Sequence, residues 1–214
     1  MALIIESRAV APFFKNGFVV ACGETRDAIL IDPGDEVDDL LRLVESRRLT
    51  VRHILLTHAH VDHVSGVARA KRATAAPVGV HRGDVFLYDA AVEQGRMFGY
   101  SLEPPPPPDF DLGASGPLGF GGCEAHVLHT PGHSPGGVCL RMAGPGVGET
   151  HLFVGDTLFA GSIGRTDLPG GDYDTLIASI KTVLFAFGDD AVVYSGHGPA
   201  TTIGEERRTN PFLR

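Results

Sequence analysis

The sequence predicts an α/β or α+β sandwich in which β-sheets lie inside and helices lie outside. Short apolar runs typical of strands are mixed with amphipathic stretches typical of helices, and the mixture occurs at both ends of the chain. Of the 214 residues, 43% are hydrophobic and 21% are charged, which is the composition of an ordinary globular protein. The length suits one compact domain, so we expect residues 1–214 to form a single domain.

The first third of the chain carries the clearest local signals. Residues 18–21 and 28–31 are apolar runs separated by Gly-Glu-Thr-Arg-Asp, which indicates a hairpin, and Asp32-Pro33-Gly34 ends the second strand. Apolar residues recur at helical spacing over 37–48, and the β-rich run 53–56 follows. Further predicted elements are helices over 64–76, 173–187 and 203–208, and strands over 78–80, 125–128, 138–142, 152–154 and 191–194.

Two segments in the middle of the chain interrupt this pattern. The five prolines of residues 104–108 are expected to form an extended surface loop within the domain, because strands of the same character resume beyond them. The segment Met97-Phe98-Gly99-Tyr100 precedes the prolines. It either lines a substrate pocket or packs as a loop on the core, and the sequence favours the packed loop.

Charge and cysteine usage exclude several classes of function. The chain has 18 Lys and Arg against 26 Asp and Glu, and the net charge of −8 argues against nucleic acid as a partner. No apolar run approaches the roughly 20 residues that span a bilayer, and residues 1–10 lack the pattern of a secretory signal, so no membrane partner is expected. Cys22, Cys123 and Cys139 are far apart with no CxxC pair, which predicts buried structural thiols and a cytoplasmic location.

Residues 58–63 concentrate side chains that bind metals. His58, His60, Asp62 and His63 come directly after the predicted strand 53–56, and a strand end that opens into a loop lets side chains converge on an ion. Imidazole and carboxylate ligands suit zinc and also iron or manganese. The alternative, a solvated histidine-rich turn, is disfavoured by the HxHxDH spacing directly after an apolar strand.

Three further polar residues share this context of a small-residue loop after an apolar run. They are His133 in His-Thr-Pro-Gly-His-Ser-Pro-Gly, Asp156 in Leu-Phe-Val-Gly-Asp-Thr and His197 in Val-Val-Tyr-Ser-Gly-His-Gly-Pro. Glycines beside a polar residue allow close approach of backbone and ligand. Together with residues 58–63 they give five histidines and two aspartates, enough for two ions with one bridging carboxylate.

The order of these motifs resembles the metallo-β-lactamase superfamily. HxHxDH is followed by a later His, then by Gly155-Asp156, then by Gly-His-Gly-Pro at 196–199, and Asp32 of Ile-Asp-Pro-Gly is the first landmark. Residues 155–167 are similar to glyoxalase II (hydroxyacylglutathione hydrolase)-like enzymes. The tail from Gly-His-Gly-Pro to Asn-Pro-Phe-Leu resembles the short, single-domain members of that group.

The resemblance implies a four-layer αβ/βα sandwich with two divalent metal ions, zinc by preference and iron or manganese as alternatives, at one edge between the sheets. By resemblance the ligands of one ion are His58, His60 and His133, those of the other are Asp62, His63 and His197, and Asp156 bridges them. It also implies that Asp62 is the catalytic residue, which orients a metal-bridging hydroxide. Asp32 would act behind the ligands by fixing a ligand loop or a histidine tautomer.

The activity implied by the resemblance is metal-dependent hydrolysis of a small-molecule thioester such as S-2-hydroxyacylglutathione. Full-length glyoxalase II has a C-terminal helical domain that contacts glutathione, and here only a short helix is expected after His197. Arg165 stands where the family carries a basic substrate-contacting residue. It either binds a substrate carboxylate or pairs with Asp167 or Asp172.

Three other activities are weighed against this one. Residues 164–167 are also similar to one-iron persulfide dioxygenases, whose ligands by resemblance would be His58, His133 and Asp156. Antibiotic hydrolysis is disfavoured, because Asp156 stands where lactamases with a thiolate ligand have Cys. A non-catalytic metal-binding module is disfavoured by the retained Asp62, since structural zinc sites are closed and often contain cysteine.

Overall fold

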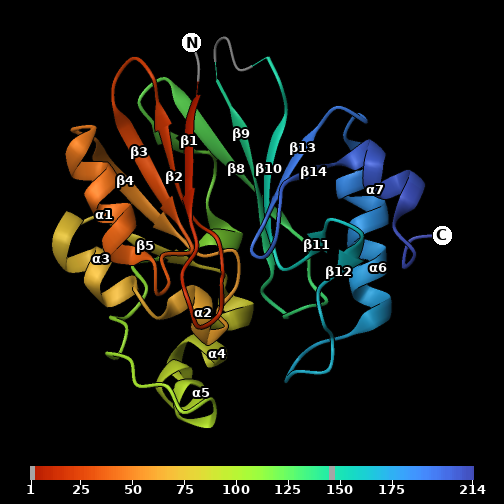
Figure 1. Cartoon of the computed structure of the whole chain (residues 1–214), viewed down its shortest axis with the longest axis horizontal. Coiled ribbons are helices and arrows are strands. Elements are labelled where there is room, and N and C mark those ends of the chain that lie inside the picture. The colour runs from red at the N-terminus through yellow and green to blue at the C-terminus, as the bar shows by residue number, and fades with distance from the viewer. Residues whose placement is uncertain (1–2, 145–147) are drawn as a thin grey trace.

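The computed structural model describes residues 3–144 and 148–214, in which two six-stranded sheets form the centre of the molecule (Figure 1). In spatial order the first sheet contains β1 (Leu3–Arg8), β2 (Gly17–Cys22), β3 (Asp27–Ile31), β4 (Thr50–Leu55), β5 (Val78–Val80) and β6 (Phe110–Asp111). The second contains β14 (Thr201–Thr202), β13 (Val192–Ser195), β10 (His151–Gly155), β9 (Val138–Ala143), β8 (Cys123–His129) and β7 (Leu118–Phe120). A separate hairpin is formed by β11 (Leu158–Phe159) and β12 (Ser162–Ile163).

Helices cover the outer side of each sheet, which confirms the predicted four-layer αβ/βα sandwich (Figure 1). The helices are α1 (Val37–Ser46), α2 (Val61–Val64), α3 (Val67–Thr74), α4 (Val85–Asp89), α5 (Ala91–Met97), α6 (Tyr173–Thr182) and α7 (Ile203–Thr209). Ile31 of the first sheet and Leu140 of the second belong to one buried cluster between the sheets. Leu40 of α1 packs in a cluster outside the first sheet, and Leu176 of α6 packs in one outside the second.

Strand direction brings the loops of the two sheets to one edge of the sandwich. In the first sheet β3, β4 and β5 are parallel to one another. In the second sheet β10 is parallel to β13, and β8 runs in the same direction because both β8 and β10 are antiparallel to β9. The segments that follow these six strands therefore leave each sheet at a common end, as ligand-carrying loops must do to meet.

The predicted elements agree with the observed ones except at a few positions. The helix expected over 64–76 is broken into α2 and α3 at Gly66, whose N–H donates to Pro33 O at 3.0 Å. A Cβ on Gly66 would lie 2.3 Å from Gly34 O, so the close approach of these two loops requires glycine there. The helix expected over 173–187 ends at Thr182. The short strands β6, β7, β11, β12 and β14 were not predicted, because two or three residues carry no readable period.

The state of the cysteines and the search for a membrane-spanning helix bear on two of the sequence predictions. Cys22, Cys123 and Cys139 are buried and form no disulfide, which confirms the prediction of buried thiols outside a disulfide framework. Over residues 3–144 and 148–214, no helix combines the length and apolar character that crossing a membrane requires.

Candidate metal centre

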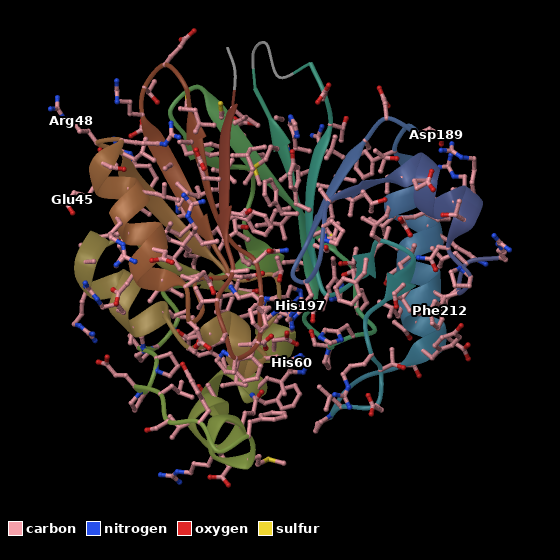
Figure 2. The ribbon with its side chains drawn as sticks, viewed as in Figure 1. Glu45, Arg48, His60, Asp189, His197 and Phe212 are labelled. Carbon is pink, nitrogen blue, oxygen red and sulfur yellow. The ribbon has the colours of Figure 1, made fainter. Side chains whose placement is uncertain are left out.

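The candidate ligands meet where the strand ends of the two sheets face each other. His60 follows β4 of the first sheet and His197 follows β13 of the second, and Figure 2 shows both side chains near the boundary between the two halves. Three sets of ligand atoms gather there, with all atoms of a set within 4.8 Å of one another. One set, His58, His63 and Asp156, shares a residue with each of the other two, which have no residue in common. The first of those two, which we call the histidine group, is His58, His60 and His133. The second, which we call the mixed group, is Asp62, His63 and His197.

The histidine group is buried, and its nitrogens face one another. His133 Nε2 lies 2.9 Å from His60 Nδ1 and 3.2 Å from His58 Nε2. Burial, together with the neighbouring histidines, lowers the pKa of His60 to about 3 and that of His58 well below its usual value. These two imidazoles are therefore neutral at physiological pH, which is the form that binds metals.

Hydrogen bonds on the far side of the rings orient the lone pairs towards the shared space. His133 Nδ1 lies 2.7 Å from Arg165 O, a carbonyl that only accepts, so Nδ1 carries the proton and Nε2 presents its lone pair. His58 Nδ1 has Thr57 Oγ1 at 3.2 Å, and Thr57 Oγ1 itself donates to Asp32 Oδ2. Two lone pairs facing each other at 3.2 Å repel unless a cation lies between them, so the histidine group fits a metal ion.

The mixed group is more open and carries charge. His197 Nε2 lies 3.2 Å from Asp62 Oδ2, and the His197 side chain is 32% exposed. Burial alone would lower the pKa of His63, but the carboxylates of Asp62, Asp32 and Asp156 raise it to about 10. Burial raises the pKa of Asp62. The nearby His63, His197 and Lys15 lower it by more, so the net shift of the Asp62 pKa is downward. In the absence of a metal, a proton on His63 thus neutralises part of the carboxylate charge.

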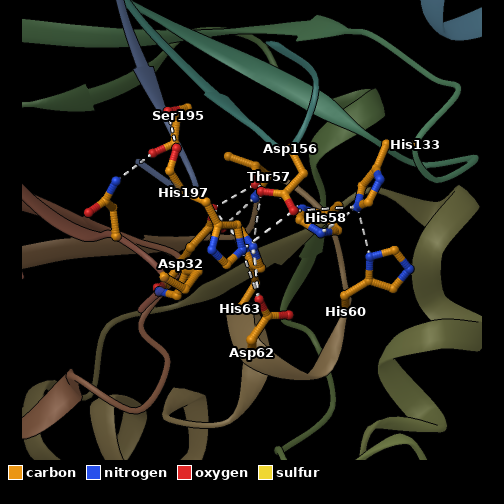
Figure 3. Close-up of polar contacts among 12 residues, drawn as sticks. Asp32, Thr57, His58, His60, Asp62, His63, His133, Asp156, Ser195 and His197 are labelled. Atoms are coloured by element: carbon orange, nitrogen blue, oxygen red, sulfur yellow. Dashed lines mark hydrogen bonds and ion pairs between the residues drawn. The ribbon is translucent and has the colours of Figure 1, made fainter. Parts of the chain in front are cut away.

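Asp156 lies between the two groups, as Figure 3 shows. Its Oδ2 is 3.8 Å from His133 Nε2 and 3.6 Å from His197 Nε2, so one carboxylate oxygen faces both sets. Its Oδ1 and His63 Nε2, 3.4 Å apart, are both buried without a hydrogen-bond partner. Buried polar atoms without partners are rare, and these two fit a cation that bonds to both.

Asp32 lies behind the ligands at the end of β3. Its carboxylate accepts from Thr57 N at 2.7 Å and from Thr57 Oγ1 at 2.6 Å, and it lies 2.9 Å from His63 Nδ1. The proton between Asp32 and His63 therefore sits on Nδ1, which leaves Nε2 to face the site. Asp32 connects the loop after β3 to the loop after β4.

Asp84 is a site residue that our sequence analysis missed. It is fully buried, and its carboxylate accepts from Ala59 N at 3.1 Å, Ser134 Oγ at 2.7 Å and Gly136 N at 2.6 Å. Ala59 stands between His58 and His60, and Ser134 follows His133, so Asp84 ties together both loops of the histidine group. The signal was present, because Asp84 comes shortly after the apolar strand 78–80, like the other candidates.

A buried ion pair was also missed on the side of the mixed group. Lys15 Nζ donates to Glu36 Oε1 at 2.6 Å, and both side chains are 1% exposed. Lys15 Nζ also donates to Asp32 O. The next residue, Asn16, donates from Nδ2 to Ser195 O at 3.1 Å and to Gly198 O at 2.8 Å, on either side of His197. The loop before β2 thus fastens the loops of Asp32 and His197.

A cavity of about 310 Å³ opens onto the ligands. Its lining includes His60, Asp62, His133, Asp156 and His197, together with Arg165. Arg165 donates from Nε and Nη2 to the two oxygens of Asp167 at 2.7 and 2.8 Å, so in the structure its guanidinium is paired with Asp167.

The segment 97–100 is placed differently from the favoured prediction. Met97 and Phe98 line the cavity and are 78% and 59% exposed, so the packed-loop prediction is wrong for these two side chains. Phe98 begins the turn after α5, and Tyr100 OH donates to Asp35 Oδ1 to hold the segment at its far end.

Comparisons with known proteins agree with this geometry. The profile of the metallo-β-lactamase superfamily matches residues 10–197. The hydroxyacylglutathione hydrolase GloC of Haemophilus influenzae is 39% identical over 98% of this chain and 97% of its own length. The structure of TTHA1623 in a di-iron-bound form is 42% identical with a TM-score of 0.84, covering 97% of this chain and all of that one. The structure of the BLEG-1 B3 metallo-β-lactamase is 37% identical with a TM-score of 0.87, covering 98% and 99%.

Proposed function

The chain belongs to the metallo-β-lactamase superfamily, and from this premise we propose that it is a metal-dependent hydrolase of acyl thioesters such as S-2-hydroxyacylglutathione. One observation carries the proposal: members of both groups of metal-ligand atoms, together with Asp156 between them, line one cavity. The similarity to a protein named as a hydroxyacylglutathione hydrolase supports thioesters as the substrate class.

The residues present fit two divalent ions. His58, His60 and His133 would hold one, Asp62, His63 and His197 would hold the other, and Asp156 would contact both. Two bound divalent cations supply a water that is deprotonated near neutral pH and a positive charge that stabilises an oxyanion. The similarity to a di-iron structure supports two ions and leaves zinc, iron and manganese to be distinguished by metal analysis.

The chain's own side chains have separate tasks in this proposal. Asp62 faces the cavity with a carboxylate whose lowered pKa keeps it ionised, so it can accept a hydrogen bond from the attacking water and orient it. Asp32 and Asp84 hold the ligand loops in place without facing the cavity. The leaving group is a thiolate, whose low basicity removes the need for a strong acid beside it.

The proposal is tested by turnover of S-D-lactoylglutathione, measured with metal-replete protein and with the same protein after chelation. We expect hydrolysis that is lost on chelation and restored by added zinc, iron or manganese, with about two metal ions per chain when active. Absence of hydrolysis by fully loaded protein would refute S-D-lactoylglutathione as a substrate.

Two control assays separate the competing activities. Oxygen uptake with glutathione persulfide, together with one iron per chain, would support the dioxygenase instead. The dioxygenase pattern needs His58, His133 and Asp156 around one ion. In this chain the group of ligand atoms that contains Asp156 contains His58 and His63 instead, and His133 belongs to another group. Hydrolysis of a β-lactam faster than of thioesters would support a lactamase, which the similarity to BLEG-1 makes a necessary control.

A further inference from the structure

The cavity above the ligands has a polar floor and an apolar wall. Phe13 comes from the loop between β1 and β2, Leu87 from α4, and Met97 and Phe98 from the end of α5. Leu168 and Pro169, beyond β12, also line the cavity. With Val61 of α2, five separate segments of the chain supply apolar side chains to the space in which a substrate would lie over the ligands.

The aromatic side chains of the wall are held in place by contacts with one another, although they face solvent. The rings of Phe13 and Phe98 meet edge to face with centroids 6.2 Å apart, and Phe13 meets Tyr100 in the same way at 5.9 Å. Tyr100 in turn donates to Asp35 Oδ1. Phe98 remains 59% exposed and Met97 78% exposed, which leaves apolar area that a ligand can cover. Exposed apolar surface that is contiguous with a cavity is typical of a ligand-binding groove.

Cationic groups that would recognise an anionic substrate are scarce in the same cavity. Among its lining residues in the described parts of the chain, Arg165 is the one Lys or Arg, and its guanidinium already forms two hydrogen bonds to Asp167. Gln94, another polar lining residue, donates a hydrogen bond from its side-chain amide to Leu87 O at 2.7 Å. A glutathione moiety carries two carboxylates, which are usually bound by free Arg or Lys side chains.

We propose that the preferred substrate is a thioester carrying an uncharged apolar group, aromatic or branched, that packs against Phe13, Met97 and Phe98. The inference rests on the proposed thioesterase function and narrows its substrate class. In the reaction the oxygen of water bonds to the acyl carbon, the C–S bond breaks, and the thiol leaves with one proton while the acid is released. The apolar wall contributes binding to whichever half of the thioester carries the apolar group.

Three thioesters test the proposal on the same metal-replete protein. S-D-lactoylglutathione is polar in both halves, S-phenylacetylglutathione has an apolar acyl group, and the S-benzyl thioester of D-lactate has an apolar thiol. We expect kcat/KM for at least one of the two apolar thioesters to exceed that for S-D-lactoylglutathione by about tenfold or more, as a well-filled apolar pocket gives. The apolar thioester with the higher kcat/KM shows whether the acyl half or the thiol half of the substrate faces the wall.

The comparison separates failure of the apolar substrate class from failure of the thioesterase function. Hydrolysis of S-D-lactoylglutathione at a kcat/KM equal to or above both apolar thioesters would overturn the apolar substrate class and leave the thioesterase function standing. No hydrolysis of any of the three by loaded protein would overturn both.

Variants connect the preference to the wall. Phe98→Ala should lower kcat/KM for the preferred apolar thioester by roughly tenfold and reduce its advantage over S-D-lactoylglutathione. Phe212→Ala removes a phenylalanine that is 44% exposed and lies away from the cavity, so it should leave the ratio of the two substrates unchanged. Figure 2 shows Phe212 at the far side of the second half of the molecule. An unchanged ratio in Phe98→Ala would contradict the assignment of the wall.

Arg165 gives the opposing test. If Arg165 bound a glutathione carboxylate, Arg165→Ala would raise KM for S-D-lactoylglutathione by about tenfold and leave KM for the S-benzyl thioester of D-lactate unaltered. That result would contradict the inference that Asp167 keeps Arg165 from binding substrate, and it would place glutathione in the cavity. We expect the two KM values to change in parallel, because the Arg165 guanidinium is engaged by Asp167.

Discussion

The histidine group and the mixed group lie side by side, yet the fold builds them by opposite means. The histidine group is buried, contains only imidazoles, and has its two loops tied by Asp84. The mixed group combines a carboxylate with two histidines, and His197 is partly exposed to the cavity. It is supported from behind by Asp32 and from the side by Asn16. The contrast suggests that the first group mainly fixes an ion and the second handles charge and protons during turnover.

The largest expected effect comes from removing the carboxylate of the mixed group. Asp62→Ala should lower kcat for thioester hydrolysis by about three orders of magnitude, because one side chain is lost both as ligand and as partner of the attacking water. The fold should persist, since Asp62 lies at a cavity surface. Steady-state kinetics and circular dichroism check the two statements. Asp38→Ala, on an exposed face of α1, is the matched control, and full activity in Asp62→Ala would remove Asp62 from the mechanism.

Asp84→Asn should affect the histidine group more than the mixed group. Asparagine keeps one acceptor oxygen and places an amide N–H₂ against the donors Ala59 N, Ser134 Oγ and Gly136 N, so at least one of them loses its partner. We expect metal affinity at the histidine group to fall by about 10- to 100-fold, as is usual when a residue that orients ligands is changed. Competition with a chromogenic chelator measures both affinities. Asp89→Asn, exposed on the neighbouring α4, should leave both unchanged.

A larger loss at the mixed group than at the histidine group would contradict this role of Asp84. An equal loss at both would mean that Asp84 supports the whole loop system rather than one set of ligands.

The two groups should also differ in how metal affinity depends on pH. The pKa of His63 is raised to about 10, so below that pH a metal entering the mixed group must displace a proton, and its affinity should fall about tenfold for each unit of decreasing pH. His58 and His60 have lowered pKa values and are already neutral between pH 7 and 9, so affinity at the histidine group should change little there. Calorimetry in buffers of different ionisation enthalpy reports the released proton. Two affinities with the same pH slope would contradict the distinction.

The comparison also explains how far the sequence alone could lead. The strand-then-loop pattern located all the candidate ligands, because HxHxDH and the later Gly-flanked residues are each local in sequence. Asp84 and Asn16 act on partners about 50 and 180 residues away, and such contacts depend on how the two sheets are placed. The break at Gly66 likewise depends on Pro33 and Gly34, which the helical spacing of 64–76 does not reveal. Local pattern thus identified the candidate ligands, while the residues that support them required the tertiary structure.

The smallest expected effect belongs to the support of the mixed group. Asn16→Ala removes two hydrogen bonds to the backbone around His197, from Asn16 Nδ2 to Ser195 O and to Gly198 O, and leaves the ligands themselves intact. Since each such bond contributes on the order of 1 kcal/mol, and water can replace part of it near a partly exposed loop, we expect metal affinity at the mixed group to fall by only about fivefold. The histidine group should keep its affinity, and Ser46→Ala at the exposed end of α1 should change neither. The same chelator competition measures these differences. If Asn16→Ala weakened the two groups equally, the loop before β2 would support the sandwich edge as a whole rather than the mixed group alone.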